Sequence, residues 1–246
     1  MKKIFLVAAL LAVSASLSAQ NFKYTWKRVF MDKTYESENI LEVDKIVAAH
    51  QKDMTSLMEV LIYSDAEIVS RRPESALSNL AADVLYYTAQ DYKDENIPMM
   101  SLTNFGGIRN NFPQGSVRLY DVLATFPFDN SLVLAKVKGS EIRKILEGFA
   151  RRDKFEALGG IQMTVKNGKL KECLIEGKPL KDKKMYYIAT IDFLLDGGDR
   201  FHIGKDAVSV KRTGIMLRDA VEAYLRKLST ESKVLTNEKD GRIKFE

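Results

Sequence analysis

The chain has 246 residues, and its 38 basic and 33 acidic side chains leave a net charge of +5 at neutral pH. This charge is small and dispersed, so it does not indicate a protein that binds a nucleic-acid polymer. Cys173 is the single cysteine, which excludes an internal disulfide, and we expect it to pack within a strand. The length suits one large domain with a sizeable hydrophobic core.

The first 19 residues have the pattern of a signal peptide. Lys2 and Lys3 precede an apolar run over residues 4–13, and small residues follow up to Ala19. The run is too short to span a bilayer, so we expect no membrane span. A buried N-terminal helix is the alternative interpretation. We therefore expect an exported, soluble protein of the periplasm or extracellular space, in which residues 20–38 form an extended lead-in.

Four segments have the spacing of amphipathic helices. Asn39 can cap the first, whose apolar positions follow helical spacing over residues 43–58. Pro73 suits the first turn of the second helix, and Ser140 can cap the third. The fourth helix is predicted over residues 217–228, where the apolar side chains again share one face.

Short apolar runs predict the strands, which lie at residues 62–69, 98–103, 131–138, 161–166, 169–175 and 185–190, with an edge strand at 242–245. Asn167 and Gly168 supply the strongest hairpin signal, between the fourth and fifth of these runs. Because helices and strands alternate irregularly, we predict an α+β fold with a mixed sheet and packed helices, not a doubly wound parallel sheet. No linker rich in Pro, Gly or Ser divides the chain, so residues 39–246 are assigned to one domain.

Three loops follow or flank predicted strands, where α/β proteins commonly bind ligands. Residues 104–109 hold two adjacent glycines that let backbone amides approach a ligand, and Arg109 offers a planar fork to a phosphate or a base edge. In the second loop, Pro127 stiffens the backbone and can hold Phe128 in a fixed direction. The third loop, residues 192–199, places an aromatic residue six positions before an aspartate that can accept hydrogen bonds from vicinal hydroxyls.

Each loop also has an ordinary structural interpretation. The first is then a glycine turn with a surface arginine, and the second contributes a core phenylalanine. The third is an Asp-Gly turn beside a buried phenylalanine.

In this order and spacing, the loops resemble the C-terminal domain of the 5′-nucleotidase and UDP-sugar hydrolase family. Residues 74–80 resemble the start of that domain, and the matches continue through Gly115, the helix at 139–147 and the Gly159–Gly160 step. The resemblance covers about residues 40–246. It implies the fold of that domain in a free-standing form.

The resemblance also implies how a nucleoside is held. Phe128 and Phe193 match the aromatic pair that sandwiches the nucleobase, and Asp199 matches the aspartate that holds the ribose hydroxyls. Stacking on an aromatic ring contributes about 1 to 3 kcal/mol for any base, so a double stack gives affinity with broad nucleotide scope.

Four further residues are assigned to the ligand on the same resemblance. Asn104 and Arg109 match residues that face the base and the phosphates. Gly159 matches a glycine beside the base, and Arg71 matches another ligand arginine, although Arg72 is its neighbour.

The family's metal site has no counterpart in this sequence. Family members hydrolyse phosphate esters with two metal ions, which Asp, His and Asn side chains of an N-terminal domain hold. Here only His50 and His202 are present, neither lies in a cluster with ligand spacing, and we interpret both as structural. We therefore expect no cofactor and no catalytic residue on this chain, and divalent metals only in a partner.

Because the predicted signal peptide leads almost directly into the binding domain, we expect that a metal domain is not encoded here. A separately encoded, exported metallophosphatase chain would then dock onto this one and supply the metals for nucleotide catabolism. Two alternatives stay open. One is a protein that binds nucleotides or nucleosides outside the cytoplasm without hydrolysis, and the other is a structural or interaction domain that lost the ligand.

Overall fold

The computed structural model describes residues 24–26, 41–94 and 96–246. The predicted signal peptide (1–19), nearly all of the predicted lead-in (20–38) and the cap predicted at Asn39 lie outside the described residues.

Two compact units make up the chain, residues 1–49 and 50–246. The helix predicted over residues 43–58 is present as α2 (Leu41–Leu57), which crosses the division between the units. The elements after α2 all belong to the second unit. Within the described ranges, no helix has the length and apolar character needed to cross a membrane.

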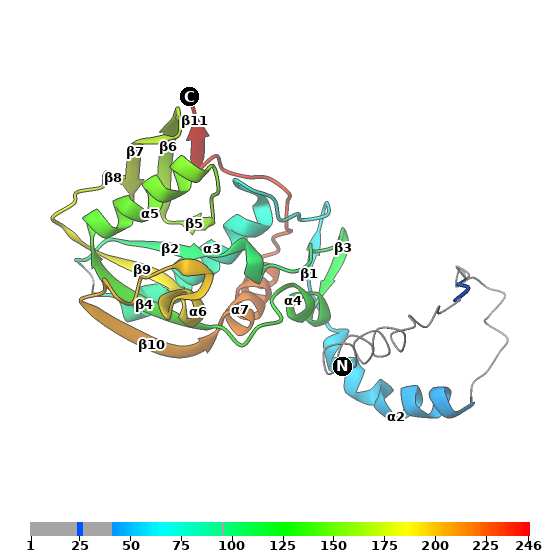
Figure 1. Cartoon of the computed structure of the whole chain (residues 1–246). Helices are drawn as coiled ribbons and strands as arrows, with labels where there is room; N and C mark the ends of the chain where they lie inside the picture. Colours follow the sequence, from blue (N-terminus) through cyan, green and yellow to red (C-terminus); the bar gives the residue numbers. More distant parts are fainter. Residues whose placement is uncertain (1–23, 27–40, 95) are drawn as a thin grey trace, which may run out of the picture. The chain divides into compact units, whose positions relative to one another are not determined.

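A five-stranded mixed sheet forms the centre of the second unit (Figure 1). Its strands, in spatial order, are β10 (Ser209–Met216), β4 (Ser131–Lys138), β9 (Met185–Ile191), β2 (Met99–Thr103) and β5 (Ala157–Gly159). Only the β2–β9 pair is parallel, and the other three pairs are antiparallel. The predicted α+β fold with a mixed sheet is confirmed.

A four-stranded sheet carries the predicted hairpin. Its order is β11 (Ile243–Phe245), β6 (Ile161–Lys166), β7 (Lys169–Ile175) and β8 (Lys178–Pro179). Asn167 and Gly168 adopt positive φ angles of 47° and 70°, as the tight turn between β6 and β7 requires. The edge strand predicted at the C-terminus is confirmed as β11, which pairs with β6 in parallel.

A third sheet has two strands, β1 (Val60–Ser64) and β3 (Gly115–Arg118). The strand predicted over 62–69 is therefore shorter and starts earlier than expected. Beyond Ser64 the chain makes an isolated bridge from Ile68 to Phe112 instead of continuing the ladder.

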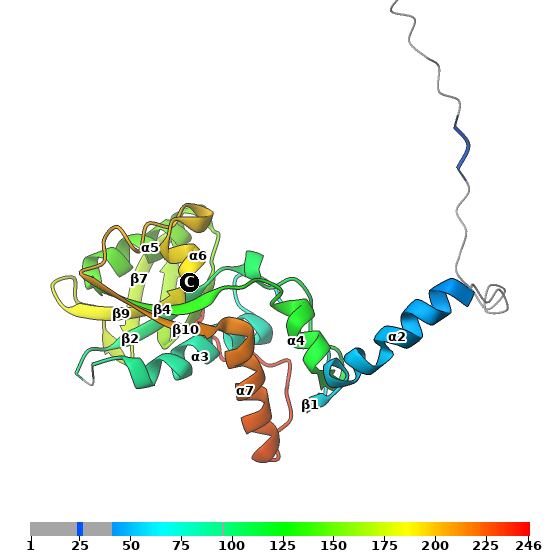
Figure 2. The same ribbon diagram turned by 90° about the horizontal axis from the view of Figure 1, so that it is seen from below.

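Helices cover both faces of the five-stranded sheet (Figure 2). They are α3 (Ala76–Ala89), α5 (Gly139–Arg152), α6 (Asp192–Leu195) and α7 (Leu217–Thr230), whereas α4 (Leu119–Thr125) packs mainly against β3 and α7. α3 contacts β2, β4, β5 and β9, whereas α7 contacts α3, α4, β1 and β10. α5 contacts β4 in one sheet and β7 in the other, so it joins the two sheets.

The starts of α3 and α5 differ from the prediction. Pro73 precedes α3, and Ser75 caps the helix instead, because its side chain accepts a hydrogen bond from the Ser78 N–H and the Ser78 hydroxyl accepts one from the Ser75 N–H. At α5, Ser140 is not the cap. The first N–H groups of α5 donate to backbone carbonyls of residues 182–184, so no side-chain cap is required.

Cys173 packs within β7, as predicted, and is 6% exposed. Burial raises the pKa of its thiol to about 12. Because the thiolate is the reactive form, we expect the folded protein to react negligibly with 5,5′-dithiobis(2-nitrobenzoate) at pH 8, and the urea-unfolded chain to react with one equivalent. Rapid stoichiometric reaction of the folded protein would contradict this burial.

Candidate functional site

The three predicted ligand loops lie together, although they are far apart in the sequence. The Asn104 side-chain amide donates a 2.5 Å hydrogen bond to Asp199 Oδ2, which joins the first loop to the third. The guanidinium of Arg109 lies 5.7 Å from the centre of the Phe128 ring, which joins the first loop to the second. Five of the seven predicted ligand residues therefore lie on loops that touch one another.

A further contact joins the second loop to the third. Asp192 accepts hydrogen bonds from the Ser131 backbone N–H at 3.1 Å and from the Ser131 hydroxyl at 2.6 Å. The same carboxylate accepts the backbone N–H of Phe193 at 2.8 Å. Because Ser131 begins β4 and Asp192 follows the end of β9, the two neighbouring strands fix where the Phe128 loop ends and where the Phe193 loop begins.

Phe128 and Phe193 are half-exposed, at 44% and 45%, and not part of the core. Among the described residues, the two rings make no direct contact with each other, and Arg109 lies near one of them. Gly198 makes room for the other ring, because a Cβ at this position would lie 2.6 Å from carbons of the Phe193 ring. A nucleobase between the two rings stays a prediction.

Asn104 is 4% exposed and stands at the end of β2. Gly106 and Gly107 wrap around its amide, and a Cβ on either glycine would lie 3.2 Å from Nδ2 or 3.0 Å from Oδ1. Nδ2 has Asp199 as its acceptor, whereas Oδ1 is buried without a hydrogen-bond donor in the described part of the chain. The glycine pair therefore positions a polar side chain, and one of its buried atoms has an unused capacity to accept a hydrogen bond.

Arg71 and Arg109, the two predicted ligand arginines, line one shallow cavity of about 340 Å³. Arg72 lines it too, but its guanidinium is already engaged. It donates to both oxygens of Glu156 at 2.7 and 2.9 Å and lies 4.5 Å from the centre of the Phe105 ring. The Arg71 side chain is exposed and makes no hydrogen bond or ion pair within the described ranges. Arg71 is thus the one of the two neighbours with its donors free.

Glu156 is the residue that sequence reasoning missed at this site. It is 6% exposed, and its Oε2 accepts the backbone N–H of Phe105 at 2.7 Å in addition to Arg72. It therefore holds the start of the first loop. The one sequence signal was Arg72 beside Arg71, which gave no indication of a partner 84 residues away.

The comparison with protein families matches residues 56–206 to the 5′-nucleotidase C-terminal domain. The chain belongs to this family. The matched range includes all seven predicted ligand residues and all three loops.

Members of the 5′-nucleotidase family align with half or more of this chain. The human 5′-nucleotidase is 28% identical over 214 residues, which are 77% of this chain and 37% of the human protein. Protein UshA of Escherichia coli K12 is 29% identical over 128 residues, 50% of this chain and 23% of UshA. The chain therefore spans well under half the length of these relatives.

Solved structures show the same fold. The 5′-nucleotidase precursor from Thermus thermophilus superposes with a TM-score of 0.69 at 23% identity, over 83% of this chain and 43% of that one. The NAD nucleotidase of Haemophilus influenzae superposes with a TM-score of 0.63 at 18% identity, over 90% of this chain and 46% of that one.

Gly159 lies apart from the other predicted ligand residues of this 5′-nucleotidase-family domain. It is buried in β5, where a Cβ would lie 2.3 Å from Ser101 Oγ and 3.1 Å from the backbone of Ala82 in α3. Its lack of a side chain lets α3 pack against the sheet, and its position beside a base stays a prediction.

Neither histidine lies in a metal-like cluster in the described part of this 5′-nucleotidase-family domain, and no three His, Cys, Asp or Glu side chains there form a group suited to a metal ion. His202 is exposed and follows Phe201, and His50 lies on α2.

Proposed function

We propose that this chain is the exported, nucleotide-binding component of a 5′-nucleotidase-type phosphoesterase. In this proposal it determines substrate specificity, and a separately encoded metallophosphatase chain supplies the two metal ions and the hydrolytic chemistry. Phe128 and Phe193 stack the base, Asp199 binds the ribose hydroxyls, and Arg71 and Arg109 bind the phosphates.

The observation that carries the proposal is the pair of half-exposed phenylalanine rings, whose loops are joined by the Ser131–Asp192 hydrogen bonds, beside the Asn104–Asp199 pair. Two exposed aromatic rings on adjoining loops, beside a polar pair, offer the faces on which a base can stack. The donors of Arg71 are free, and Arg109 uses one of its donors on the Gly106 carbonyl at 3.3 Å. Both arginines lie on the same loops or next to them, which suits a phosphate attached to the stacked nucleoside.

The metal-binding partner is inferred from the residues of this chain. Two histidines in 246 residues are too few for the imidazole-rich site that a two-metal phosphoesterase requires.

Mixing this chain with a purified metallophosphatase chain that lacks a C-terminal domain of this kind tests the proposal. We expect AMP hydrolysis in the mixture at a rate at least tenfold above the sum of the separate chains. A mixture with the Phe128→Ala variant serves as the matched control and should lose most of this gain.

Two other outcomes would redirect the interpretation. Nucleotide binding with no gain in hydrolysis on mixing would favour a binding protein without a hydrolytic partner. The absence of any nucleotide or nucleoside binding would favour a structural domain that lost its ligand.

A further inference from the structure

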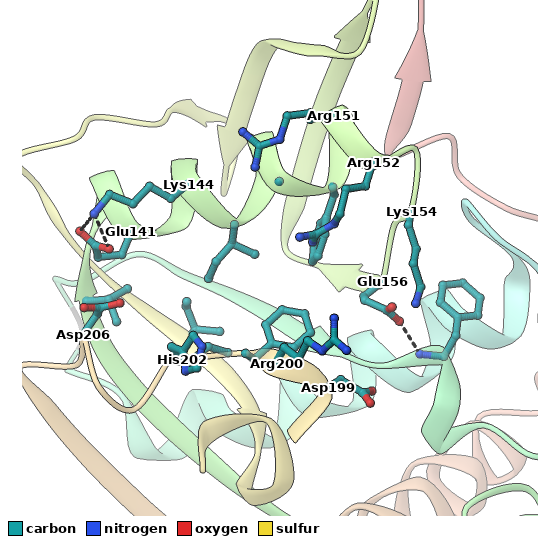
Figure 3. A pocket seen from close by; sticks show the side chains of 18 of the residues that line it. Glu141, Lys144, Arg151, Arg152, Lys154, Glu156, Asp199, Arg200, His202 and Asp206 are labelled. Atoms are coloured by element: carbon teal, nitrogen blue, oxygen red, sulfur yellow. Dashed lines mark hydrogen bonds and ion pairs between the residues drawn. The ribbon is translucent and has the colours of Figure 1, made fainter. Parts of the chain in front are cut away.

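A charged cavity of about 890 Å³ opens between α5 and the segment that follows α6 (Figure 3). One wall belongs to α5 and the residues just after it, and the other belongs to residues 199–206. The apolar part of its lining consists of Phe105, Val137, Ile145, Phe149, Ile188, Phe201 and Ile203. Phe128 and Phe193 are not among the described residues that line it, so it is distinct from the proposed stacking site.

The cavity has an excess of uncompensated positive charge. Six cationic and four anionic side chains line it. Lys144 is neutralised by Glu141 at 2.9 Å, and Arg72 by Glu156 at 2.7 Å. The remaining four cations make no side-chain hydrogen bond or ion pair within the described part of the chain; they are Arg151, Arg152, Lys154 and Arg200.

The four free cations come from two segments that face each other. Arg151 and Arg152 end α5, and Lys154 follows the helix, whereas Arg200 projects from the opposite wall (Figure 3). Cations are favourable at the C-terminal end of a helix, which accounts for Arg151 and Arg152. The same effect does not account for Lys154, beyond the helix, or for Arg200, which holds a positive φ of 64° on the other wall.

The cavity is continuous with the proposed nucleoside site at Asp199. This aspartate lines the cavity, and Arg200 is its neighbour in sequence. Asp199 Oδ2 accepts the Asn104 amide, whereas Oδ1 accepts no hydrogen bond from the described residues. A ribose held at Oδ1 would therefore lie at the edge of this cavity.

We propose that this cavity binds a phosphoryl group carried by an organic anion. Arg152, Lys154 and Arg200 hold the phosphoryl oxygens, and the apolar lining contacts the carbon skeleton. Two sources supply this chemistry. The group is a second phosphate on the ribose of a bound nucleotide, a case that rests on the proposed function, or it belongs to a separate phosphorylated compound.

Isothermal titration of the full chain with pyrophosphate, AMP and adenosine 3′,5′-bisphosphate separates the two sources. The test variant combines Arg152→Gln, Lys154→Gln and Arg200→Gln, which removes charge and retains side-chain length. The control combines Lys178→Gln and Lys183→Gln, two exposed lysines outside the cavity. Lys154→Gln alone, which leaves α5 and the 199–206 segment unchanged, is measured in case the triple variant does not fold.

For a ribose phosphate, we expect the bisphosphate to bind the parent at least tenfold more tightly than AMP, and the triple variant to lose this difference. For a separate ligand, we expect pyrophosphate to bind the parent protein without any nucleoside present. The triple variant should then bind pyrophosphate at least tenfold more weakly. Lys154→Gln should lower the affinity for the bisphosphate in the first case, and for pyrophosphate in the second, about threefold. The control variant should match the parent in both cases.

The proposal is overturned if the triple variant binds pyrophosphate and the bisphosphate as tightly as the parent does. If the triple variant is unfolded, the same result for Lys154→Gln overturns it. Pyrophosphate held by Arg71 and Arg109 would give that result. Failure of the proposed function has a different signature, because AMP and adenosine would then not bind the parent, whereas pyrophosphate would still report on the cavity. Phe128→Ala should weaken AMP binding and leave pyrophosphate binding unchanged.

Discussion

Replacing Phe128 with alanine is expected to weaken adenosine binding by about tenfold or more, and Phe193→Ala should have a similar effect. Each change removes one stacking surface, worth about 1 to 3 kcal/mol for a base, and about 1.4 kcal/mol corresponds to a factor of ten in affinity. Both side chains are half-exposed, so neither substitution empties the core. Isothermal titration with adenosine and with AMP measures the effect.

Phe245 provides the matched control. It lies on β11, is 52% exposed, and takes no part in the three loops. Phe245→Ala should therefore leave adenosine binding unchanged, and Phe128→Tyr should retain it because the ring is kept. Unaltered adenosine binding by both alanine variants, at positions 128 and 193, would refute the stacking assignment.

The second large effect concerns stability and follows from Arg242. This arginine is 7% exposed, and its guanidinium donates to Asp83 at 2.8 and 2.9 Å and to Asp240 at 2.6 Å. It also donates to the Leu158 carbonyl at 2.7 Å. Because Arg242 immediately precedes β11, this one side chain attaches the C-terminal strand to α3 and to β5.

Arg242→Ala is expected to lower the free energy of unfolding by about 3 kcal/mol. Removing one partner of a buried ion pair costs about 3 to 5 kcal/mol, and the lower end applies because Asp240 is largely exposed. Urea denaturation followed by circular dichroism measures the change. Arg226→Ala is the matched control, since its ion pairs with Glu59 and Glu222 lie at the surface and should contribute far less.

The loss of unfolding free energy caused by Arg242→Ala should also depend on pH. Burial raises the pKa of Asp83, and the hydrogen bonds from Arg242 lower that of Asp240. In the variant, Asp83 loses its cation, so its folded-state pKa rises further above the unfolded value. The stability of the variant then falls as pH rises from the unfolded-state pKa of Asp83 to its folded-state pKa, because the folded state holds the proton more tightly. The difference from the parent should therefore be smaller at pH 5 than at pH 7, and a larger difference at pH 5 would contradict this account.

Sequence patterns predicted the elements whose signal is local. The hairpin turn at Asn167 and Gly168 and the strand β4 were predicted to the residue. β10 (Ser209–Met216) was missed because it is an edge strand with mostly exposed side chains and no apolar alternation. The cap predicted at Ser140 was wrong because carbonyls more than forty residues later satisfy the start of α5.

The features of the candidate site also divide into those with a local sequence signal and those without one. Glycine pairs and aromatic residues marked the three loops in the sequence, but spacing carries no information about the contact between Asn104 and Asp199, which are 95 positions apart. The cavity beside α5 was not predicted either. Its two walls, residues 141–154 and 199–206, meet only through the tertiary packing of the sheet.

The contact of Gly198 with the Phe193 ring has an energetic consequence for any ligand. Together with the Asp192 and Ser131 hydrogen bonds, it holds this loop in one arrangement before a ligand arrives. Ordering a mobile loop during association costs conformational entropy, which subtracts from affinity. A loop that is already rigid avoids this loss, so a flat ring that meets Phe193 retains more of its stacking energy as affinity.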